Sequence, residues 1–220
     1  MLINRRHIND TITIVRAFFV FSLLFLTWGA LAQTRTDAVA EYRSGNYERA
    51  ISICKQDIAA NPRNIDSHVV LCWSLIRLAR YREAQGYATT GRAISRFDQR
   101  IIEVLGEISY YEGRNIEALQ YFQEYINTSP EGQRIDVVYY FIGEIYILLG
   151  RFKRADIALS TAVYYSPGNA AWWTRLAYAR ECGGELQQAI AAYAEALRLN
   201  SQASDARRGI ERARQSLLGR

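Results

Sequence analysis

The 220-residue chain contains little cysteine, proline or histidine, with three, three and two of these residues. So few cysteines exclude a small scaffold held together by disulfides, and so few prolines exclude a collagen-like or proline-rich chain. Half of the residues are hydrophobic, which is enough to form packed cores and excludes a disordered polypeptide. The length therefore suits one ordinary domain or an extended array of small units.

The chain also lacks a strong excess of charge in its central part. Its formal net charge is +5, but residues 1–32 and 201–220 account for all of it, and residues 33–200 contain 19 basic and 19 acidic side chains. Binding to nucleic acid requires many cations that neutralise phosphates. We therefore expect no nucleic-acid partner.

Residues 1–32 show the three parts of a secretory signal peptide. Basic residues up to Arg16 precede an apolar run over 17–28, and Ala30-Leu31-Ala32 matches the small-residue pattern of a signal-peptide cleavage site. We expect cleavage between Ala32 and Gln33, export to a bacterial periplasm, and only transient membrane contact. The alternative is an uncleaved inner-membrane anchor. It is disfavoured because only 16 uncharged residues lie between Arg16 and Gln33, whereas a spanning helix needs about 20.

Five segments of the remaining chain share one short sequence motif, and each motif ends in an alanine. The alanines are separated by 34, 34, 37 and 34 residues, and the longer interval coincides with three extra residues near 131–134. Each unit has two apolar segments of helical period, with a glycine between them in four units, so we predict paired helices. One such pair cannot bury its own apolar face, and neighbouring pairs must stack. The five alanines are Ala50, Ala84, Ala118, Ala155 and Ala189.

The fourth unit has the fullest set of recurring residues: Tyr139, Ile142, Gly143, Tyr146, Ala155, Leu159, Ala162 and Pro167. In this pattern, residues 34–200 resemble the tetratricopeptide repeat (TPR) family. The resemblance implies an all-α fold, a right-handed superhelix (α-solenoid) of about five helix-turn-helix repeats. The array is predicted over 33–200, with repeats at 33–64, 65–98, 99–132, 136–169 and 170–203. A C-terminal capping segment, 204–220, follows, with a helix predicted over 204–218.

The chain beyond the leader offers little material for chemistry. We expect no catalytic residues, no metal and no cofactor, because one histidine and three scattered cysteines cannot form the usual zinc site. Phosphate-binding glycine loops and the common hydrolase motifs are missing as well. His68, the histidine beyond the leader, is expected to pack in the fold. The sequence therefore predicts a protein that is not an enzyme.

Cys54 and Cys72 are predicted on helices that touch, so a disulfide between them is one interpretation in an oxidising compartment. The alternative, which we favour, is two buried thiols, because a disulfide requires a narrow geometry and free cysteine packs like a small hydrophobic residue.

The family resemblance implies that the first helix of each repeat lines an inner groove, which usually binds peptides or proteins. Positions spaced +3, +4, +3 form one stripe on each of these helices. The candidate binding residues are Tyr42, Val69, Trp73, Glu103, Glu107, Tyr110, Tyr140, Glu144, Tyr178 and Glu181.

Two features of this stripe point to binding. Its aromatic residues are of the types enriched at binding hot spots. Its glutamates, Glu103, Glu107 and Glu144, predict a negative cluster whose repulsion a basic peptide would relieve. The alternative is that the aromatic residues pack between repeats and the glutamates form an ordinary solvated face. The carboxylate clamp of chaperone-adaptor relatives does not carry over, because the stripe lacks the corresponding Lys, Arg and Asn.

Two functional hypotheses follow. The first is an exported, non-catalytic scaffold that binds a partner protein or peptide in its concave groove. The second is a small-ligand-binding accessory subunit of a membrane transporter. A closed aromatic cavity with few polar groups would favour the second hypothesis. An open groove in which Glu103, Glu107 and Glu144 face solvent would favour the first.

Overall fold

A computed structural model describes residues 37–219, and in this range every regular element is an α-helix. The predicted signal peptide and its cleavage site between Ala32 and Gln33 lie outside the described residues. The helices are α2 (Ala38–Arg43), α3 (Tyr47–Ala60), α4 (Ile65–Arg77), α5 (Tyr81–Ile94), α6 (Gln99–Tyr111), α7 (Asn115–Thr128), α8 (Ile135–Leu148), α9 (Phe152–Tyr165), α10 (Ala170–Cys182), α11 (Leu186–Leu199) and α12 (Ser204–Leu218).

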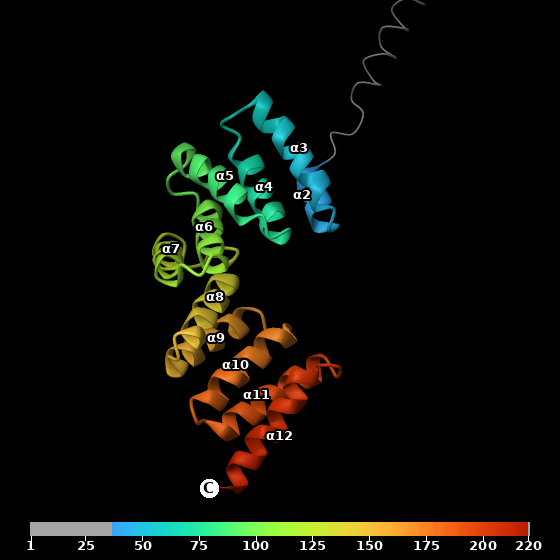
Figure 1. The fold of residues 1–220 in the computed structure, drawn as a ribbon, viewed down its shortest axis with the longest axis vertical. Helices are drawn as coiled ribbons and strands as arrows, with labels where there is room; N and C mark the ends of the chain where they lie inside the picture. Colours follow the sequence, from blue (N-terminus) through green and yellow to red (C-terminus); the bar gives the residue numbers. More distant parts are fainter. Residues whose placement is uncertain (1–36, 220) are drawn as a thin grey trace, which may run out of the picture.

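Consecutive helices pair and the pairs succeed one another along the long axis of the molecule, from α2 and α3 at one end to α12 at the other (Figure 1). Within the described range each helix packs mainly on its neighbours in sequence. This arrangement confirms the predicted all-α repeat superhelix. α2 is the exception in length, with 6 residues against 13 in α4, and it contributes no buried residue.

The turn inside each pair requires a left-handed residue. Gly45, Gly113, Gly150 and Gly184 have φ between 65° and 84°, a region that glycine enters without steric cost. In the second pair Ala79 takes this position with a φ of 56°. The glycines at the predicted turns therefore terminate the first helices, as the sequence pattern indicates.

Small residues allow the two helices of a pair to approach closely. A Cβ atom on Gly106 would lie 2.5 Å from the Phe122 ring, and one on Gly143 would lie 2.4 Å from Leu159. The recurring alanines have no exposed surface. Each pair is therefore held by contacts that a larger residue would break.

The last helix closes the array. α12 covers the residues predicted for it and buries Ala206, Gly209 and Ala213. Gly209 is essential to this contact, because a Cβ there would lie 2.2 Å from the ring of Tyr193 on α11. The opposite face of α12 is polar and exposed.

Two polar residue types of the core behave largely as predicted. His68 is 1 % exposed and its Nε2 lies 3.0 Å from the carbonyl oxygen of Pro62. Cys54 and Cys72 are buried free thiols, and burial, with the charge of Asp57, raises the pKa of Cys54 to about 12. The interpretation as buried thiols therefore fits the structure.

None of the helices between residues 37 and 219 combines the length and the hydropathy that a membrane crossing needs.

Candidate functional site

The first helices of all five repeats contribute to one hollow of about 280 Å³, which we call the inner hollow. Elements so far apart in sequence reach the same hollow only because the array curves around it. Its lining residues are Tyr42 of α2, Trp73, Ile76 and Arg77 of α4, Glu107 and Tyr111 of α6, Arg134 at the N-cap of α8, Val137, Tyr140 and Phe141 of α8, and Trp172 of α10.

Six of the eleven residues that line the inner hollow are aromatic. The ring centroid of Trp73 lies 5.8 Å from that of Tyr42. Across the hollow, Tyr140 stacks on Trp172 at 5.0 Å with an interplanar angle of 13°. Rings fixed against one another in this way offer apolar contact area at little cost in conformational entropy.

A buried ionic network lies beneath one side of the hollow. Glu103 has no exposed surface and Glu107 is 7 % exposed. The Nη2 atom of Arg134 lies 2.6 Å from Oε1 of Glu103 and 2.7 Å from Oε1 of Glu107. Trp73 Nε1 donates a further bond to Oε2 of Glu103 at 3.3 Å. One arginine thus compensates two carboxyl groups that water cannot reach freely.

The network changes the protonation equilibria of its members. Burial and then the charge of Glu103 raise the pKa of Glu107 well above its ordinary value, and Arg134 only partly offsets this. Burial lowers the pKa of Arg134, but the two carboxylates outweigh burial and the net pKa is raised. Arg134 therefore stays charged, and Glu107 keeps its proton to a higher pH than an exposed glutamate does.

This pairing corrects the expected negative cluster. Glu144, the third glutamate of the cluster, is also buried and accepts a bond of 2.7 Å from Nε of Arg175. The glutamates do not form a solvated face, and each is paired with an arginine, although Glu107 still reaches the inner hollow. A basic peptide would find its favourable partners already occupied by arginines.

Contacts between neighbouring helices account for the pairing of these glutamates with arginines. The pairs Glu103–Arg134, Glu144–Arg175 and Glu181–Arg212 are each separated by 31 residues in sequence. Glu144–Arg175 joins units spaced 34 residues apart, which corresponds to a shift of about one helical turn between neighbouring first helices. Glu103–Arg134 spans the 37-residue interval instead and depends on the three extra residues near 131–134. In each of these three pairs the arginine lies beside a glutamate of the preceding first helix.

Four of the predicted binding residues line the inner hollow: Tyr42, Trp73, Glu107 and Tyr140. Tyr110 is half-buried and packs its ring 5.0 Å from that of Phe141, next to the lining. These residues are brought together by the structure as the stripe predicts.

The other predicted residues lie elsewhere. Val69 has no exposed surface and belongs to the core, so it is not part of the groove surface. Tyr178 is 36 % exposed, with Cζ of Arg175 5.2 Å from its ring centroid. Glu181 accepts bonds from Arg212 and from the hydroxyl of Tyr193, so it fastens α12 to the array.

Seven lining residues are not among the predicted binding residues: Ile76, Arg77, Tyr111, Arg134, Val137, Phe141 and Trp172. Tyr111 and Phe141 directly follow the predicted Tyr110 and Tyr140, because adjacent helices cross at an angle and the exposed stripe shifts by one position. Arg134 is different. The three extra residues near 131–134 bring it to the start of α8, and its backbone N–H donates to the Tyr125 hydroxyl at 3.1 Å.

Arg77 is the cation of the hollow that no carboxylate neutralises within residues 37–219. Its Nε donates to the hydroxyl of Tyr47 at 3.3 Å, and this hydrogen bond is the main cause of its raised pKa. Arg134 also keeps an unpartnered Nε in the described structure. The inner hollow therefore combines aromatic rings with Arg77 and with the ion-paired Arg134 and Glu107.

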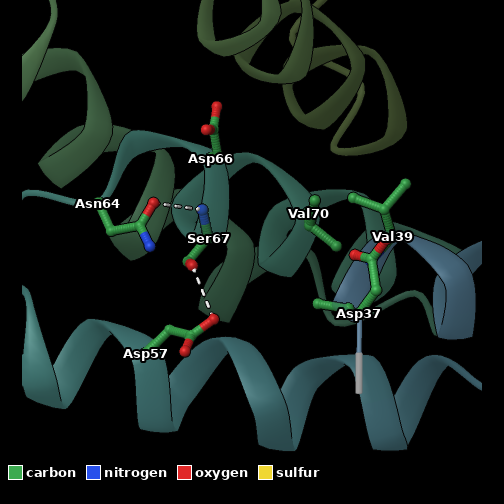
Figure 2. A pocket seen from close by; sticks show the side chains of 8 residues that line it. Asp37, Val39, Asp57, Asn64, Asp66, Ser67 and Val70 are labelled. Atoms are coloured by element: carbon green, nitrogen blue, oxygen red, sulfur yellow. Dashed lines mark hydrogen bonds between the residues drawn. The ribbon is translucent and has the colours of Figure 1, made fainter. Parts of the chain in front are cut away.

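A second hollow, of about 270 Å³, lies at the start of the described chain between α2, α3 and α4. Figure 2 shows Ser67 donating through its hydroxyl to Asp57 at 3.3 Å, while Asn64 accepts from the Ser67 backbone. Asp66 is held by Arg100 at 2.7 Å and Asp37 caps α2. Its polar groups thus serve local structure.

Within the same described range, no group of three or more His, Cys, Asp and Glu side chains is arranged to hold a metal ion.

Comparison with known proteins supports the repeat assignment. A model of the tetratricopeptide repeat matches residues 137–169, which correspond to α8 and α9. No curated protein matches the chain significantly by sequence. The repeat that matches is the unit whose recurring residues are most complete.

Solved structures share the fold over most of the chain. A chain of the anaphase-promoting complex hetero-tetramer Cut9-Hcn1 is similar with a TM-score of 0.75 at 19 % identity, over 80 % of this chain and 35 % of its own length. PilW, described as a widely conserved type IV pilus biogenesis factor, gives 0.69 at 17 % identity, over 83 % and 89 % of the two chains. YrrB, described as a TPR protein with an unusual peptide-binding site, gives 0.64 at 14 % identity, over 76 % and 84 %. The chain therefore spans about a third of the Cut9-Hcn1 chain, and the fold is that of TPR arrays.

Proposed function

We propose that the protein is an exported, non-catalytic scaffold that binds a segment of a partner protein in the inner hollow. The observation that carries the proposal is that this hollow is walled by aromatic rings from successive repeats and holds the unneutralised Arg77. Aromatic residues and arginine are the types that dominate binding energy at protein interfaces. The similarity to YrrB, whose published description mentions a peptide-binding site, is consistent with this use of the fold.

The size of the hollow supports a peptide side chain as its occupant. Pockets for drug-sized ligands usually measure about 300–1,000 Å³, and the inner hollow measures about 280 Å³. One or two side chains of a bound segment would fill it. The three charged lining residues, Arg77, Glu107 and Arg134, favour the scaffold over a transporter subunit that captures a small molecule, whose pocket would carry few polar groups.

The charge of the hollow suggests the chemistry of the bound segment. Since Arg134 and Arg175 already compensate the buried glutamates, Arg77 is the cation left for a ligand. We infer a segment that inserts an aromatic or large aliphatic side chain between Trp73 and Tyr140 and places a carboxylate near Arg77. Such a carboxylate could be held by two parallel hydrogen bonds from the guanidinium.

A photo-crosslinking amino acid at Val137 tests the site in living cells of the source organism with the full chain. Val137 lines the hollow, whereas Gln123 on α7 is exposed away from it and serves as the control position. We expect a discrete protein adduct from Val137 and none from Gln123. Equal labelling at both positions, or labelling at neither, would contradict binding in the hollow.

The same crosslink measures the role of Arg77. Arg77→Gln should lower the yield at Val137 about tenfold, since a charged hydrogen bond contributes about 1.5–3 kcal/mol. Arg82→Gln removes an exposed cation of α5 outside the hollow and should leave the yield unchanged. A small-molecule site would give no protein adduct in any variant.

Export is the part of the proposal that rests on the leader sequence. N-terminal sequencing of protein from the cell-envelope fraction should begin at Gln33. A start near Met1 would favour the uncleaved anchor.

A further inference from the structure

The turn between α8 and α9 differs in charge from the corresponding turns of the second and third repeats. In those repeats, Arg80 pairs with Glu48 and Glu83, and Arg114 pairs with Glu112 and Glu117. At the α8–α9 turn three cations lie within four residues: Arg151, Lys153 and Arg154. All three are exposed, and none has a carboxylate within ion-pair distance in the range 37–219.

The carboxylates near this turn do not cancel the three cations. Asp156 is held by Arg180 at 2.7 Å. Glu185 borders the same hollow as Lys153, together with Asp156 and Arg180. Four cations and two carboxylates therefore meet here, and the local charge is positive.

Large apolar side chains flank the cations. Leu148 is 63 % exposed, Leu149 is 41 % exposed and Ile157 is 69 % exposed. Ile157 follows Lys153 by four residues on α9, so the two side chains share one face of the helix. Exposed aliphatic residues cost free energy in water, and three of them beside three cations that have no carboxylate partner in the described range form an amphipathic patch, in which Arg154 also lies over the Tyr146 ring at 5.8 Å.

We propose that this turn patch (Leu148, Leu149, Arg151, Lys153, Arg154 and Ile157) docks on the surface of a lipid bilayer that carries anionic headgroups. The cations would contact lipid phosphates, while the leucines at the tip of the turn would enter the boundary between headgroups and acyl chains. The fourth repeat lies within the array (Figure 1), and the patch shares no residue with the inner hollow. Membrane and partner could therefore be bound at the same time.

A bilayer fits the patch better than a nucleic acid or an acidic protein. Contacts with nucleic-acid phosphates would gain nothing from Leu148 and Leu149, which precede the cations directly in the turn. At a bilayer surface the cations can contact lipid headgroups while the leucines lie at the boundary with the acyl chains. Amphipathic segments that bind membrane surfaces are arranged in this way.

The exposed Cys182 provides a reporter for the test. It borders a hollow with Gly150, Arg151, Phe152, Lys153 and Arg154, while the other two cysteines are buried. An environment-sensitive fluorophore on Cys182 of the full chain would report insertion at the turn, independently of membrane contact elsewhere. Vesicles of phosphatidylcholine with about 30 % phosphatidylglycerol should shift its emission to the blue, and pure phosphatidylcholine vesicles should not.

Matched variants assign the shift to the patch. Replacing Arg151, Lys153 and Arg154 by Gln should weaken vesicle binding about a hundredfold, at about fivefold for each cation. Leu148→Ser with Leu149→Ser should weaken it at least tenfold. The control is replacement of Arg43, Arg82 and Arg96 by Gln, which removes the same net charge from exposed positions elsewhere and should have no effect beyond about twofold.

Three outcomes would overturn the proposal. One is an unchanged emission spectrum with anionic vesicles. Another is an equal loss of binding in the control variant, which would assign attraction to net charge alone. The third is the same shift on adding soluble poly-glutamate or an oligonucleotide without lipid, which would identify an acidic macromolecule as the partner.

Discussion

The charged side chains of the inner wall and those of the α8–α9 turn differ in burial and in pairing. On the inner wall, Glu103, Glu107 and Glu144 are buried and each is bound by an arginine of the following repeat. At the turn, Arg151, Lys153 and Arg154 are exposed and have no carboxylate partner among residues 37–219. Both regions belong to a stretch whose overall charge is zero by count. Pairing in space therefore separates charges that stabilise the fold from charges that remain for a partner.

Removal of the shared arginine should produce the largest effect on the inner wall. Arg134→Met leaves Glu103 and Glu107 buried without a cation, and we expect a loss of about 3–5 kcal/mol in the free energy of unfolding. Chemical denaturation followed by circular dichroism would measure this loss.

A second variant separates the ionic role of Arg134 from its packing role. Arg134→Met combined with Glu103→Gln and Glu107→Gln removes the uncompensated carboxylates and should recover most of the stability. If this triple variant is as unstable as the single one, the contact of Arg134 over the Trp73 ring, at 5.4 Å, is what stabilises the wall.

Neutralising one carboxyl group should have a smaller effect of opposite sign. The pKa of Glu107 is raised in the folded protein by burial and by Glu103, so its contribution to stability is present below the ordinary glutamate pKa of about 4.3. This contribution is lost as the pH rises through the folded-state pKa. Glu107→Gln should therefore stabilise the protein by about 1 kcal/mol at neutral pH and flatten the decline of stability with pH.

Thermal unfolding across a pH series would show this difference. Glu131→Gln is the matched control, because Glu131 is exposed in the loop before α8. A parallel change in both variants would mean that net charge, and not the buried pair, sets the pH dependence.

The smallest effect on stability is expected at the turn. Replacing Arg151, Lys153 and Arg154 by Gln should change the free energy of unfolding by less than about 0.5 kcal/mol, since no ion pair is lost. Denaturant unfolding of this variant and of the wild type should coincide. A loss above about 1 kcal/mol would show that these cations stabilise the fold, and the contrast with the inner wall would disappear.

The fold could be predicted from the sequence because the same constraints recur in every repeat. Gly150 marks a left-handed turn and Ala155 marks a close approach of two helices, and their equivalents recur at nearly constant spacing. Each position is determined by its own repeat and its direct neighbours. Such local constraints are readable from one chain.

The site was predicted only in part because it depends on how repeats are placed against each other. Trp73 and Tyr140 lie on the predicted stripe and line the hollow. Tyr111 and Phe141 follow the predicted Tyr110 and Tyr140 by one residue, and the crossing angle that exposes them cannot be read from periodicity within one helix. The pairing of Glu103 with Arg134 could not be read from the repeat spacing, because it depends on the three extra residues that bring Arg134 to the start of α8.

The 31-residue spacing of the glutamate–arginine pairs has a mechanical consequence. The three glutamate–arginine pairs join α6 to α8, α8 to α10 and α10 to α12. Ion pairs therefore connect successive first helices and the last helix in the C-terminal half of the array. At the other end, α2 is a single short helix without a buried residue. The resistance of the array to stretching should therefore differ along its length. Under tension applied between residues 37 and 219, the contacts of α2 should be lost first and those among α10, α11 and α12 last.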